Sequence, residues 1–374
     1  MSESERYQRH SLIDWFDQEA LQRAHIIVIG AGAVGNEAIK NLAMLGVGHL
    51  HLVDMDRIEE HNLTRSVLFR ENDIGRFKAT VAAERCSELN PDLAVTYSSL
   101  DFWDGLTLGE IGAADAVVCC VDNYEARIGL NQLCLTMGTD FYNSGIDSRY
   151  ASVEAYPHAT NPGSACYECT LPHSAYEAVS RRYSCGWLRK ASAEARKIPT
   201  TAVTASLAGS LVASTVLNRI CGHPGMPSGA IRSVQDTVTL HGTVSEIHRA
   251  YGCIGCARVG LATMHLRASR RIIAQESIFP QAHGSEGEVE LSEAALIRTS
   301  CMSCGSEIEY FESAKSLTDA VMVCAYCGQP SIDAEFTYSL PAGEFLSLFS
   351  GKEVPGKFLT YRQNGKSILI EMED

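Results

Sequence analysis

Residues 25–35 read His-Ile-Ile-Val-Ile-Gly-Ala-Gly-Ala-Val-Gly, and this stretch decides the fold of the chain. Its apolar first half is typical of a buried parallel strand. Gly30, Gly32 and Gly35 then form a G-x-G-x-x-G turn that leads into a helix-forming run, Asn36–Leu45. In such a turn the first glycine allows the tight bend, the second lets the backbone approach a phosphate, and the third lets helix and strand pack closely. The stretch predicts an α/β fold with a Rossmann-like, doubly wound sheet that binds a nucleotide.

A second apolar run, His49–Val53, predicts the neighbouring strand, and the acid pair Asp54 and Asp56 follows it. In dinucleotide-binding folds an acid at this position accepts a hydrogen bond from a ribose hydroxyl. These features indicate a nucleotide without saying which one. An NAD-dependent oxidoreductase is therefore one alternative at this point.

Three polar side chains, Asn62, Arg65 and Lys78, follow the acid pair. An arginine fork and a lysine point charge are suited to binding a triphosphate. An NAD-dependent oxidoreductase would not need them at this position. The segment resembles the ThiF/MoeB family of adenylating enzymes, which activate ubiquitin-like and sulfur-carrier proteins. The family pattern is D-x-D-x-(I/V)-x-x-x-N-L-x-R-Q with a later lysine, and Ser66 stands where the pattern has glutamine. The resemblance covers the chain from residue 5 to about residue 260 and implies an ATP site.

Another apolar run, Asp115–Val121, predicts a buried strand that ends at Asp122 and Asn123. Side chains at the carboxyl end of a parallel strand lie at the edge of the sheet where ligands bind. In the family, the acid of a similar D-N-x-x-x-R pattern holds the magnesium ion of ATP, which implies this role for Asp122. The alternative is an aspartate that only caps the following helix.

The N-terminal segment Tyr7-Gln8-Arg9-His10 is similar to the R-Y-x-R-Q start of the family. The second arginine of that start reaches the ATP site of the partner subunit, so the resemblance implies this role for Arg9 and, with it, a homodimer. The alternative is a helix within residues 1–24 that packs on the surface of the first strand. The set implied for ATP and magnesium is Gly30, Gly32, Gly35, Asp54, Asp56, Asn62, Arg65, Lys78, Asp122 and Asn123.

Composition bounds the remaining possibilities. With 374 residues the chain has room for two or more domains, and its formal net charge of −14 disfavours unassisted binding to nucleic acid. No signal segment and no continuous apolar run of about 20 residues is visible, so we expect a cytoplasmic protein without a membrane partner. Fourteen cysteines in such a protein favour metal and thiol chemistry over disulfides.

Eight of the cysteines form four C-x-x-C pairs. The last two pairs are separated by nineteen residues, which is the spacing of a zinc ribbon. Gly305 and Gly328 follow these pairs, where a knuckle turn favours positive φ. The members of this predicted zinc site are Cys301, Cys304, Cys324 and Cys327.

The first two pairs lie more than eighty residues apart, so spacing alone does not join them. In the family, an equivalent C-Y-x-C and a distal C-x-x-C share one structural zinc, and the resemblance implies the same arrangement here. A redox-active C-x-x-C is the alternative. The members of this implied zinc site are Cys166, Cys169, Cys253 and Cys256.

Cys185 is the candidate nucleophile. It lies within Arg181–Lys190, where basic side chains on both sides stabilise a thiolate. In the family, the loop between the first zinc pair and the next long helix, predicted here at Thr200–Ile220, carries the cysteine that accepts the carrier protein. The alternative is a loop cysteine in an enzyme that stops at the acyl adenylate. The other cysteines are predicted to be core or cap residues, namely Cys86, Cys119, Cys120, Cys134 and Cys221.

We expect an adenylation domain with a structural zinc at residues 1–264 and a small β-rich zinc-ribbon domain at residues 265–374. The polar stretch Gln281–Glu288 lies between the two halves. The role of the ribbon is open, since it either binds a partner or only holds its own domain together.

The resemblance implies a reaction. The C-terminal carboxylate of a ubiquitin-like protein attacks the α-phosphate of ATP, pyrophosphate leaves, and Cys185 takes the acyl group as a thioester. The short adenylation domain, basic cysteine loop and added domain resemble bacterial ubiquitin-like antiphage conjugation systems of the BilD type, which implies a downstream conjugating enzyme as a further partner. The alternatives are a sulfur-carrier adenylyltransferase for cofactor biosynthesis, adenylation of a peptide C-terminus, an NAD-dependent oxidoreductase and a non-catalytic zinc scaffold.

Overall fold

The computed structural model describes residues 5–172, 174, 200–266, 286–314, 319–349 and 352–372. The chain divides into a first compact unit, Met1–Leu171 with Lys197–Gly260, and a second, Pro172–Arg196 with Leu261–Asp374. The predicted boundary between two domains, after residue 264, stays a prediction. Cys185 and most of the polar stretch 281–288 lie outside the described residues.

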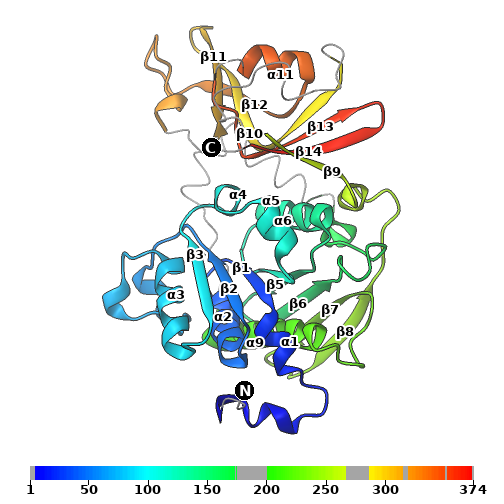
Figure 1. Cartoon of the computed structure of the whole chain (residues 1–374). Helices are drawn as coiled ribbons and strands as arrows, with labels where there is room; N and C mark the ends of the chain where they lie inside the picture. The colour runs from blue at the N-terminus through cyan, green and yellow to red at the C-terminus, as the bar shows by residue number, and fades with distance from the viewer. Residues whose placement is uncertain are drawn as a thin grey trace. The chain divides into compact units, whose positions relative to one another are not determined.

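An eight-stranded sheet with the order β3-β2-β1-β4-β5-β6-β7-β8 forms the centre of the first unit (Figure 1). Its strands are β1 His25–Ile29, β2 His49–Val53, β3 Ala94–Ser98, β4 Ala116–Cys119, β5 Phe141–Ile146, β6 Tyr150–Tyr156, β7 Ala230–Asp236 and β8 Gly242–Ile247. Strands β1 to β5 run parallel, and β6, β7 and β8 continue the sheet in antiparallel pairs. The chain order reverses between β1 and β4, and doubly wound sheets bind ligands at this switch point. The predicted Rossmann-like sheet is confirmed.

Helices cover both faces of this sheet (Figure 1). They are α1 Gln18–Arg23, α2 Ala33–Leu45, α3 Lys78–Leu89, α4 Phe102–Gly105, α5 Leu108–Ala113, α6 Tyr124–Met137 and α9 Ala202–Ile220, with short 3-10 turns η1 Glu5–Tyr7, η2 His10–Leu12, η3 Glu60–Asn62, η4 Glu71–Asp73, η5 Tyr167–Thr170 and η6 Gly255–Arg258. Ile26 and Val28 of β1 join the core cluster that also contains buried residues of α2, α3 and α9. Because side chains alternate along a strand, Ile27 and Ile29 point to the opposite face. Helix α2 begins at Ala33, three residues before the predicted start, because Gly32 serves as its N-cap residue.

Among the described helices, α9 alone is long and apolar enough to cross a membrane, by length and by the composition of its most apolar 18-residue window. Half of that window is buried. The helix packs on α2, β5 and β6, and Val212, Ala213 and Val216 belong to the main core cluster of the unit. In this structure α9 is therefore a core helix.

The second unit is rich in β-structure, as predicted. Its elements are β9 Ala262–Leu266, β10 Glu288–Cys301, β11 Glu307–Ser313, η8 Asp319–Met322, β12 Ile332–Pro341, α11 Ala342–Phe349, β13 Phe358–Gln363 and β14 Lys366–Met372. The strands form a six-stranded sheet in the order β11-β10-β13-β14-β9, with β12 paired to the long strand β10. Phe345 and Phe349 of α11 pack with Leu291, Leu359 and Ile370 to form its apolar core.

Candidate functional site

The glycine-rich turn lies at the carboxyl end of β1, next to the switch point. Gly30 has φ of +90°, and a Cβ atom there would lie 2.9 Å from the carbonyl oxygen of Cys120. A Cβ atom at Gly35 would lie 1.8 Å from the carbonyl oxygen of Gly30, so only glycine allows α2 to start this close to β1. A Cβ atom at Gly32 would meet nothing within 4 Å. The three glycines thus show the geometry expected of a turn, an open approach and a close packing contact.

The acid pair and Lys78 meet at the carboxyl end of β2. The Asp54 carboxylate accepts hydrogen bonds from the backbone N–H groups of Ala31, at 2.6 Å, and Asp56, at 2.8 Å. Burial raises the pKa of Asp54, while the positive charge of Lys78 and the two N–H groups act in the opposite direction. The Lys78 Nζ atom donates to the Asp56 carboxylate at 2.8 Å, and the lysine side chain is only 11% exposed. The structure therefore brings Asp54, Asp56 and Lys78 to the glycine turn.

Asn36, which was not among the predicted site residues, holds this turn in place. Its fully buried Nδ2 group donates to the carbonyl oxygens of Ala31, at 2.5 Å, and Gly32, at 3.2 Å. Its Oδ1 atom accepts a hydrogen bond from the backbone N–H of Leu68 at 2.9 Å. Asn36 thereby ties the first turn of α2 to the segment that carries Asn62 and Arg65. The available signal was a polar residue directly after the last glycine of the turn.

Asn62 and Arg65 lie on this segment in different surroundings. The buried Asn62 accepts a hydrogen bond from the backbone N–H of Glu59 at 2.9 Å, which caps η3, so its side chain holds the local turn. The Arg65 guanidinium is partly exposed and donates to the carbonyl oxygen of His61 at 2.8 Å. Its geometry leaves further N–H groups to meet an anion, since a guanidinium has five. The predicted ATP contacts of both residues stay predictions.

Asp122 and Asn123 follow β4 at the same edge of the sheet. The Asn123 Oδ1 atom accepts the backbone N–H of Ala126 at 2.8 Å and caps α6. The capping role considered for Asp122 thus belongs to its neighbour. Asp122 is exposed, and within the described part of the chain no hydrogen bond or ion pair of its carboxylate is found. This leaves Asp122 suited to a cation, whereas a contact between Asn123 and ATP stays a prediction.

Arg9 lies away from the site of its own chain. The segment around it packs on the C-terminal ends of α2 and α3, where the side-chain amide of Asn90 donates to the hydroxyl of Tyr7 at 2.9 Å and Gln18 donates to the carbonyl oxygen of Leu45 at 3.0 Å. Helix α2 is 13 residues long, so its two ends are about 20 Å apart. Arg9 is exposed at the end opposite the glycine turn. A role in ATP binding therefore requires a partner subunit, and it stays a prediction.

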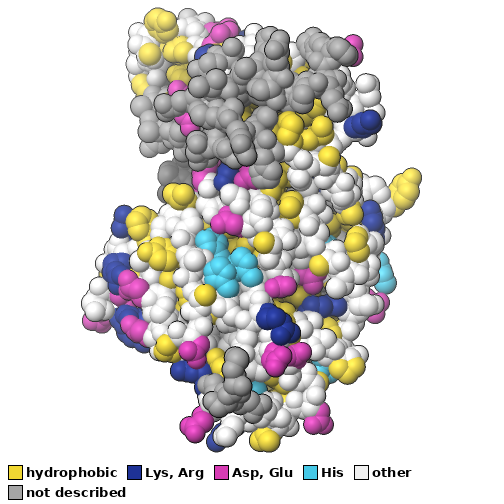
Figure 2. Space-filling model, viewed as in Figure 1, with side chains coloured by type: hydrophobic (Ala, Val, Ile, Leu, Met, Phe, Trp, Pro, Cys, Tyr) yellow, Lys and Arg dark blue, Asp and Glu magenta, His cyan; other side chains and the backbone are white. Residues whose placement is uncertain are grey.

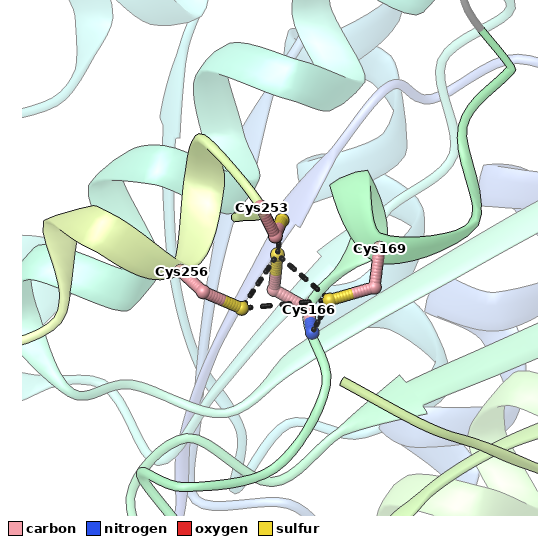
Figure 3. Close-up of side chains that lie close together, drawn as sticks. All are labelled: Cys166, Cys169, Cys253 and Cys256. Atoms are coloured by element: carbon pink, nitrogen blue, oxygen red, sulfur yellow. Dashed lines mark hydrogen bonds between the residues drawn. The ribbon is translucent and has the colours of Figure 1, made fainter. Parts of the chain in front are cut away.

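The first cysteine cluster joins η5 and η6, with the four side chains pointing toward one another (Figure 3). The Sγ distances are 3.6 Å between Cys166 and Cys253, and 3.5 Å from Cys256 to both Cys166 and Cys169. Four sulfurs around a tetrahedral zinc with bonds of about 2.3 Å lie about 3.8 Å apart. The cluster is therefore preformed for a metal ion such as zinc.

Helix α6 supports this cluster. The side-chain amide of Asn131 donates to Glu168 at 3.0 Å, and its Oδ1 atom accepts the backbone N–H of Tyr167 at 3.0 Å. A Cβ atom at Gly255 would lie 2.4 Å from a Glu168 carboxylate oxygen and 3.0 Å from the sulfur of Cys166. The buried Glu168 and Gly255 thus set how closely the two knuckles approach.

The second cysteine cluster has the geometry of a zinc ribbon. Its sulfurs lie 3.6 Å apart between Cys301 and Cys327, and 3.7 Å apart between Cys304 and Cys324. Both pairs close the same turn, because Gly305 donates to the carbonyl oxygen of Cys301 at 2.8 Å and Gly328 to that of Cys324 at 2.9 Å. Gly305 and Gly328 have φ of +72° and +70°, as predicted. This cluster, too, can hold a metal ion.

Cys256→Ser is expected to lower the zinc content from two ions to one per chain, since each of the two clusters can hold one ion. Structural zinc binds with roughly 10 kcal/mol or more, so the variant should also unfold at a lower temperature. Metal analysis by mass spectrometry and thermal unfolding measure both effects. Cys221→Ser is the matched control, because Cys221 caps the end of α9 outside the clusters. Two zinc ions retained in Cys256→Ser would contradict the assignment.

The remaining described cysteines are placed as predicted. Cys86, Cys119 and Cys134 are buried, Cys120 packs against the main core, and Cys221 is the C-cap residue of α9. Burial raises the pKa of Cys86 to about 12 and also raises the pKa of the Cys119, Cys120 and Cys134 thiols. These thiols stay protonated at neutral pH and are poor nucleophiles.

Histidine side chains gather on one face of the first unit (Figure 2). At β1 and β2, the rings of His25 and His49 stack with centroids 4.2 Å apart, and Thr96 lies between His49, at 2.9 Å, and His51, at 2.7 Å. Burial is the main cause that lowers the pKa of His25 and His51, followed for His25 by the neighbouring histidines. Within the described ranges, the groups of three or more side chains able to hold a metal are the two cysteine clusters, and the histidines are not among them.

The sheet, the open glycine turn and the charged side chains beside it define a nucleotide-binding α/β protein. The chain matches the model of the ThiF family over residues 6–250 and belongs to this family. The resemblance inferred from the motifs is thereby confirmed.

Relatives of two kinds are similar to this chain. Ubiquitin-like modifier-activating enzyme 5 of Dictyostelium discoideum is 30% identical over 213 residues, which cover 53% of this chain and 53% of that protein. The sulfur carrier protein adenylyltransferase of Thermus thermophilus is 33% identical over 175 residues, covering 46% of this chain and 65% of that protein. The chain thus spans about half to two thirds of these curated relatives. Among solved structures, E. coli MccB with ATP is 25% identical, with a TM-score of 0.55 over 68% of this chain and 74% of that one.

Proposed function

We propose that this protein is an ATP-dependent adenylyltransferase that activates the C-terminal carboxylate of a ubiquitin-like or sulfur-carrier protein. The observation that carries the proposal is Lys78, whose nearly buried ammonium is held by Asp56 beside the open glycine turn. A lysine held there places a positive charge where a phosphate would meet Gly32. The ThiF family match favours adenylation over the NAD-dependent oxidation that the glycine turn alone also allows.

In the proposed reaction, Lys78, Arg65 and Asp122 each have a role. A carboxylate is a poor acyl donor, so its oxygen attacks the α-phosphate of ATP, pyrophosphate leaves and a mixed anhydride with AMP forms. Lys78 and Arg65 offset the charge that develops on the phosphates, as positive groups do in other nucleotidyl transfers. A magnesium ion held by Asp122 would neutralise part of the same charge. No side-chain nucleophile is needed up to this point.

The second step of the proposal is transfer to Cys185. A thiolate there would attack the acyl carbon, AMP would leave, and a thioester would hold the carrier protein. Its basic sequence neighbours support this choice. The burial of Cys86, Cys119, Cys120 and Cys134 also supports this choice, because it keeps their thiols protonated and makes them poor nucleophiles. A conjugating enzyme would accept the carrier from Cys185, and an antiphage system of the BilD type is the setting that we propose for it.

The proposal includes a homodimer and a cytoplasmic location. Arg9 is exposed at the far end of α2, so only a second subunit can bring it to an ATP site. ATP is supplied in the cytoplasm, where cysteine clusters of this kind also remain reduced. Activation of a sulfur carrier for cofactor biosynthesis is the rival within the same chemistry, and the sulfur carrier protein adenylyltransferase of Thermus thermophilus favours it.

Intact mass spectrometry without reducing agent tests both steps. The wild type and Cys185→Ala are incubated with ATP, magnesium and a panel of ubiquitin-like proteins, sulfur carriers and short peptides, while pyrophosphate is measured. We expect pyrophosphate release from both proteins and a thiol-sensitive, carrier-sized mass gain in the wild type only. Cys221→Ala, the matched control, should gain the same mass as the wild type. Pyrophosphate release without any mass gain would remove the thioester step, and no ATP turnover with any acceptor would reject the proposed function.

A further inference from the structure

A row of polar side chains crosses three strands of the first unit. Asn143 on β5, Glu154 on β6 and Arg232 on β7 lie directly opposite one another in the sheet register. The Asn143 amide donates to the Glu154 carboxylate at 2.8 Å, and Arg232 donates to the same carboxylate at 2.6 Å. Asn143 and Glu154 are buried. A buried, hydrogen-bonded row of this kind holds its members in one arrangement, because an unpaired charge there is costly.

The first end of the row holds the loop that carries Asp122. Arg127, in the first turn of α6, donates to the side chain of Asn143 and to the carbonyl oxygen of Val121. Val121 directly precedes Asp122. The Arg127 guanidinium therefore fixes the backbone from which the Asp122 carboxylate projects.

The other end of the row holds the first cysteine cluster. Arg232 donates to the hydroxyl of Thr170 at 3.0 Å, and Thr170 directly follows Cys169. Helix α6 provides a second connection, because Asn123 caps its start and Asn131 binds both Tyr167 and Glu168 of the same knuckle. The Asp122 loop and the knuckle are thus joined twice, through the row and through the helix.

The position of the knuckle depends on what lies among the four sulfurs. With a metal ion bound, thiolates 3.5 to 3.9 Å apart are held together. Without one, the knuckle depends on contacts such as the hydrogen bonds to Asn131 and Arg232 and the close packing of Gly255. Because Thr170 and Glu168 belong to this knuckle, such a change passes directly to Arg232 and to α6.

We infer that the metal ion at the first cysteine cluster positions Asp122 for the nucleotide, through the polar row and α6, so that metal binding and nucleotide binding favour each other. Arg127, Asn143, Glu154, Arg232 and Thr170 are positioning residues in this coupling. The inference rests on the proposed function, in that ATP must bind at the Asp122 edge of the sheet. Coupling between two binding sites is reciprocal, so ATP must strengthen zinc binding by the same factor by which zinc strengthens ATP binding. We expect the stronger zinc binding to appear as slower release of zinc.

Zinc release measures the coupling without reference to catalysis. Zinc-loaded, full-length protein is mixed with a chromophoric zinc chelator, with and without ATP and magnesium, and ATP affinity is measured by calorimetry on the same samples. The Cys304→Ser background removes the contribution of the second cluster. ATP is expected to slow the release of the remaining zinc at least about fivefold.

Thr170→Val tests the route, because it removes only the hydroxyl that Arg232 contacts and keeps the size of the side chain. We expect ATP still to bind to this variant but to slow zinc release less than it does in the wild type, because the connection through α6 remains. Thr215→Val is the matched control, since its hydroxyl bonds the carbonyl oxygen of Leu211 within α9, outside the row, and the full effect of ATP should persist. Equal zinc release with and without bound ATP would overturn the inference, and a full effect in Thr170→Val would overturn the role of the polar row in it, while the proposed function stands in both cases. Failure of ATP to bind to the wild type would reject the proposed function together with the inference.

Discussion

Lys78→Met is expected to lower the rate of ATP–pyrophosphate exchange by about 100-fold or more, with the fold unchanged. The ammonium of Lys78 is the nearly buried positive charge beside the glycine turn, and methionine keeps its length without the charge. The acid left behind, Asp56, is 59% exposed, so water replaces its partner at little expense in stability. Loss of the lysine charge also raises the pKa of Asp54 further, because that charge opposes the effect of burial. The exchange assay is run with the carrier protein that the mass experiment identifies.

Arg149→Met is the control for this prediction. It removes a cation from an ion pair with Asp236 on β7, in the antiparallel part of the same sheet. We expect its exchange rate to stay within about twofold of the wild type, because Arg149, which is 45% exposed, is not among the residues assigned to the nucleotide. Thermal unfolding shows whether each variant keeps its fold. Near-normal exchange in Lys78→Met would mean that this lysine does not meet the phosphates.

The parts of the site that could be predicted from the sequence are those fixed by local backbone geometry. The glycine turn is one example, since positive φ at Gly30 and the contact at Gly35 follow from joining a strand directly to a helix. The ribbon is another, because two short C-x-x-C pairs at this spacing close two equivalent knuckle turns. In both cases, the residue types and their order along the chain are enough to predict the local backbone geometry.

Other parts depend on pairing between distant segments, which no short motif encodes. Asn143, Glu154 and Arg232 become neighbours only through the register of three antiparallel strands, and a shift of one residue would turn each side chain to the other face. Cys166 and Cys253 meet because η5 and η6 both pack on α6. The link between these pairs therefore came from the family resemblance and not from their spacing.

The acid pair shows that two residues of the same type, two positions apart, can have different roles that their sequence does not distinguish. The sequence placed Asp54 and Asp56 at the end of β2 but did not distinguish them. In the structure Asp54 is partly buried and its two oxygens bind backbone N–H groups, whereas Asp56 is exposed and holds Lys78. Asp54 thus shapes the turn and Asp56 positions the cation. This difference arises from burial, which depends on the packed sheet rather than on the two residues.

Gly35→Ala and Gly32→Ala are expected to separate the structural from the functional part of the glycine turn. In Gly35→Ala the new Cβ atom would lie 1.8 Å from the carbonyl oxygen of Gly30 and 2.8 Å from its carbonyl carbon, and neither backbone atom can turn away as a side chain would. Helix α2 must then move away from β1, where both contribute to the main core. We expect a loss of more than about 4 kcal/mol in the free energy of unfolding, measured by urea denaturation.

Gly32→Ala should lower the affinity for ATP while leaving the stability of the fold nearly unchanged. Gly32 has φ of −72°, an ordinary value for alanine, and its new methyl group would meet no protein atom within 4 Å. The stability should therefore fall by no more than about 1 kcal/mol, the usual effect of alanine at an N-cap. ATP affinity, measured by calorimetry, should fall at least about tenfold, because the methyl group occupies the space in which a phosphate meets the start of α2. Wild-type affinity in Gly32→Ala would place the phosphates elsewhere, and wild-type stability in Gly35→Ala would show that the turn does not have this geometry.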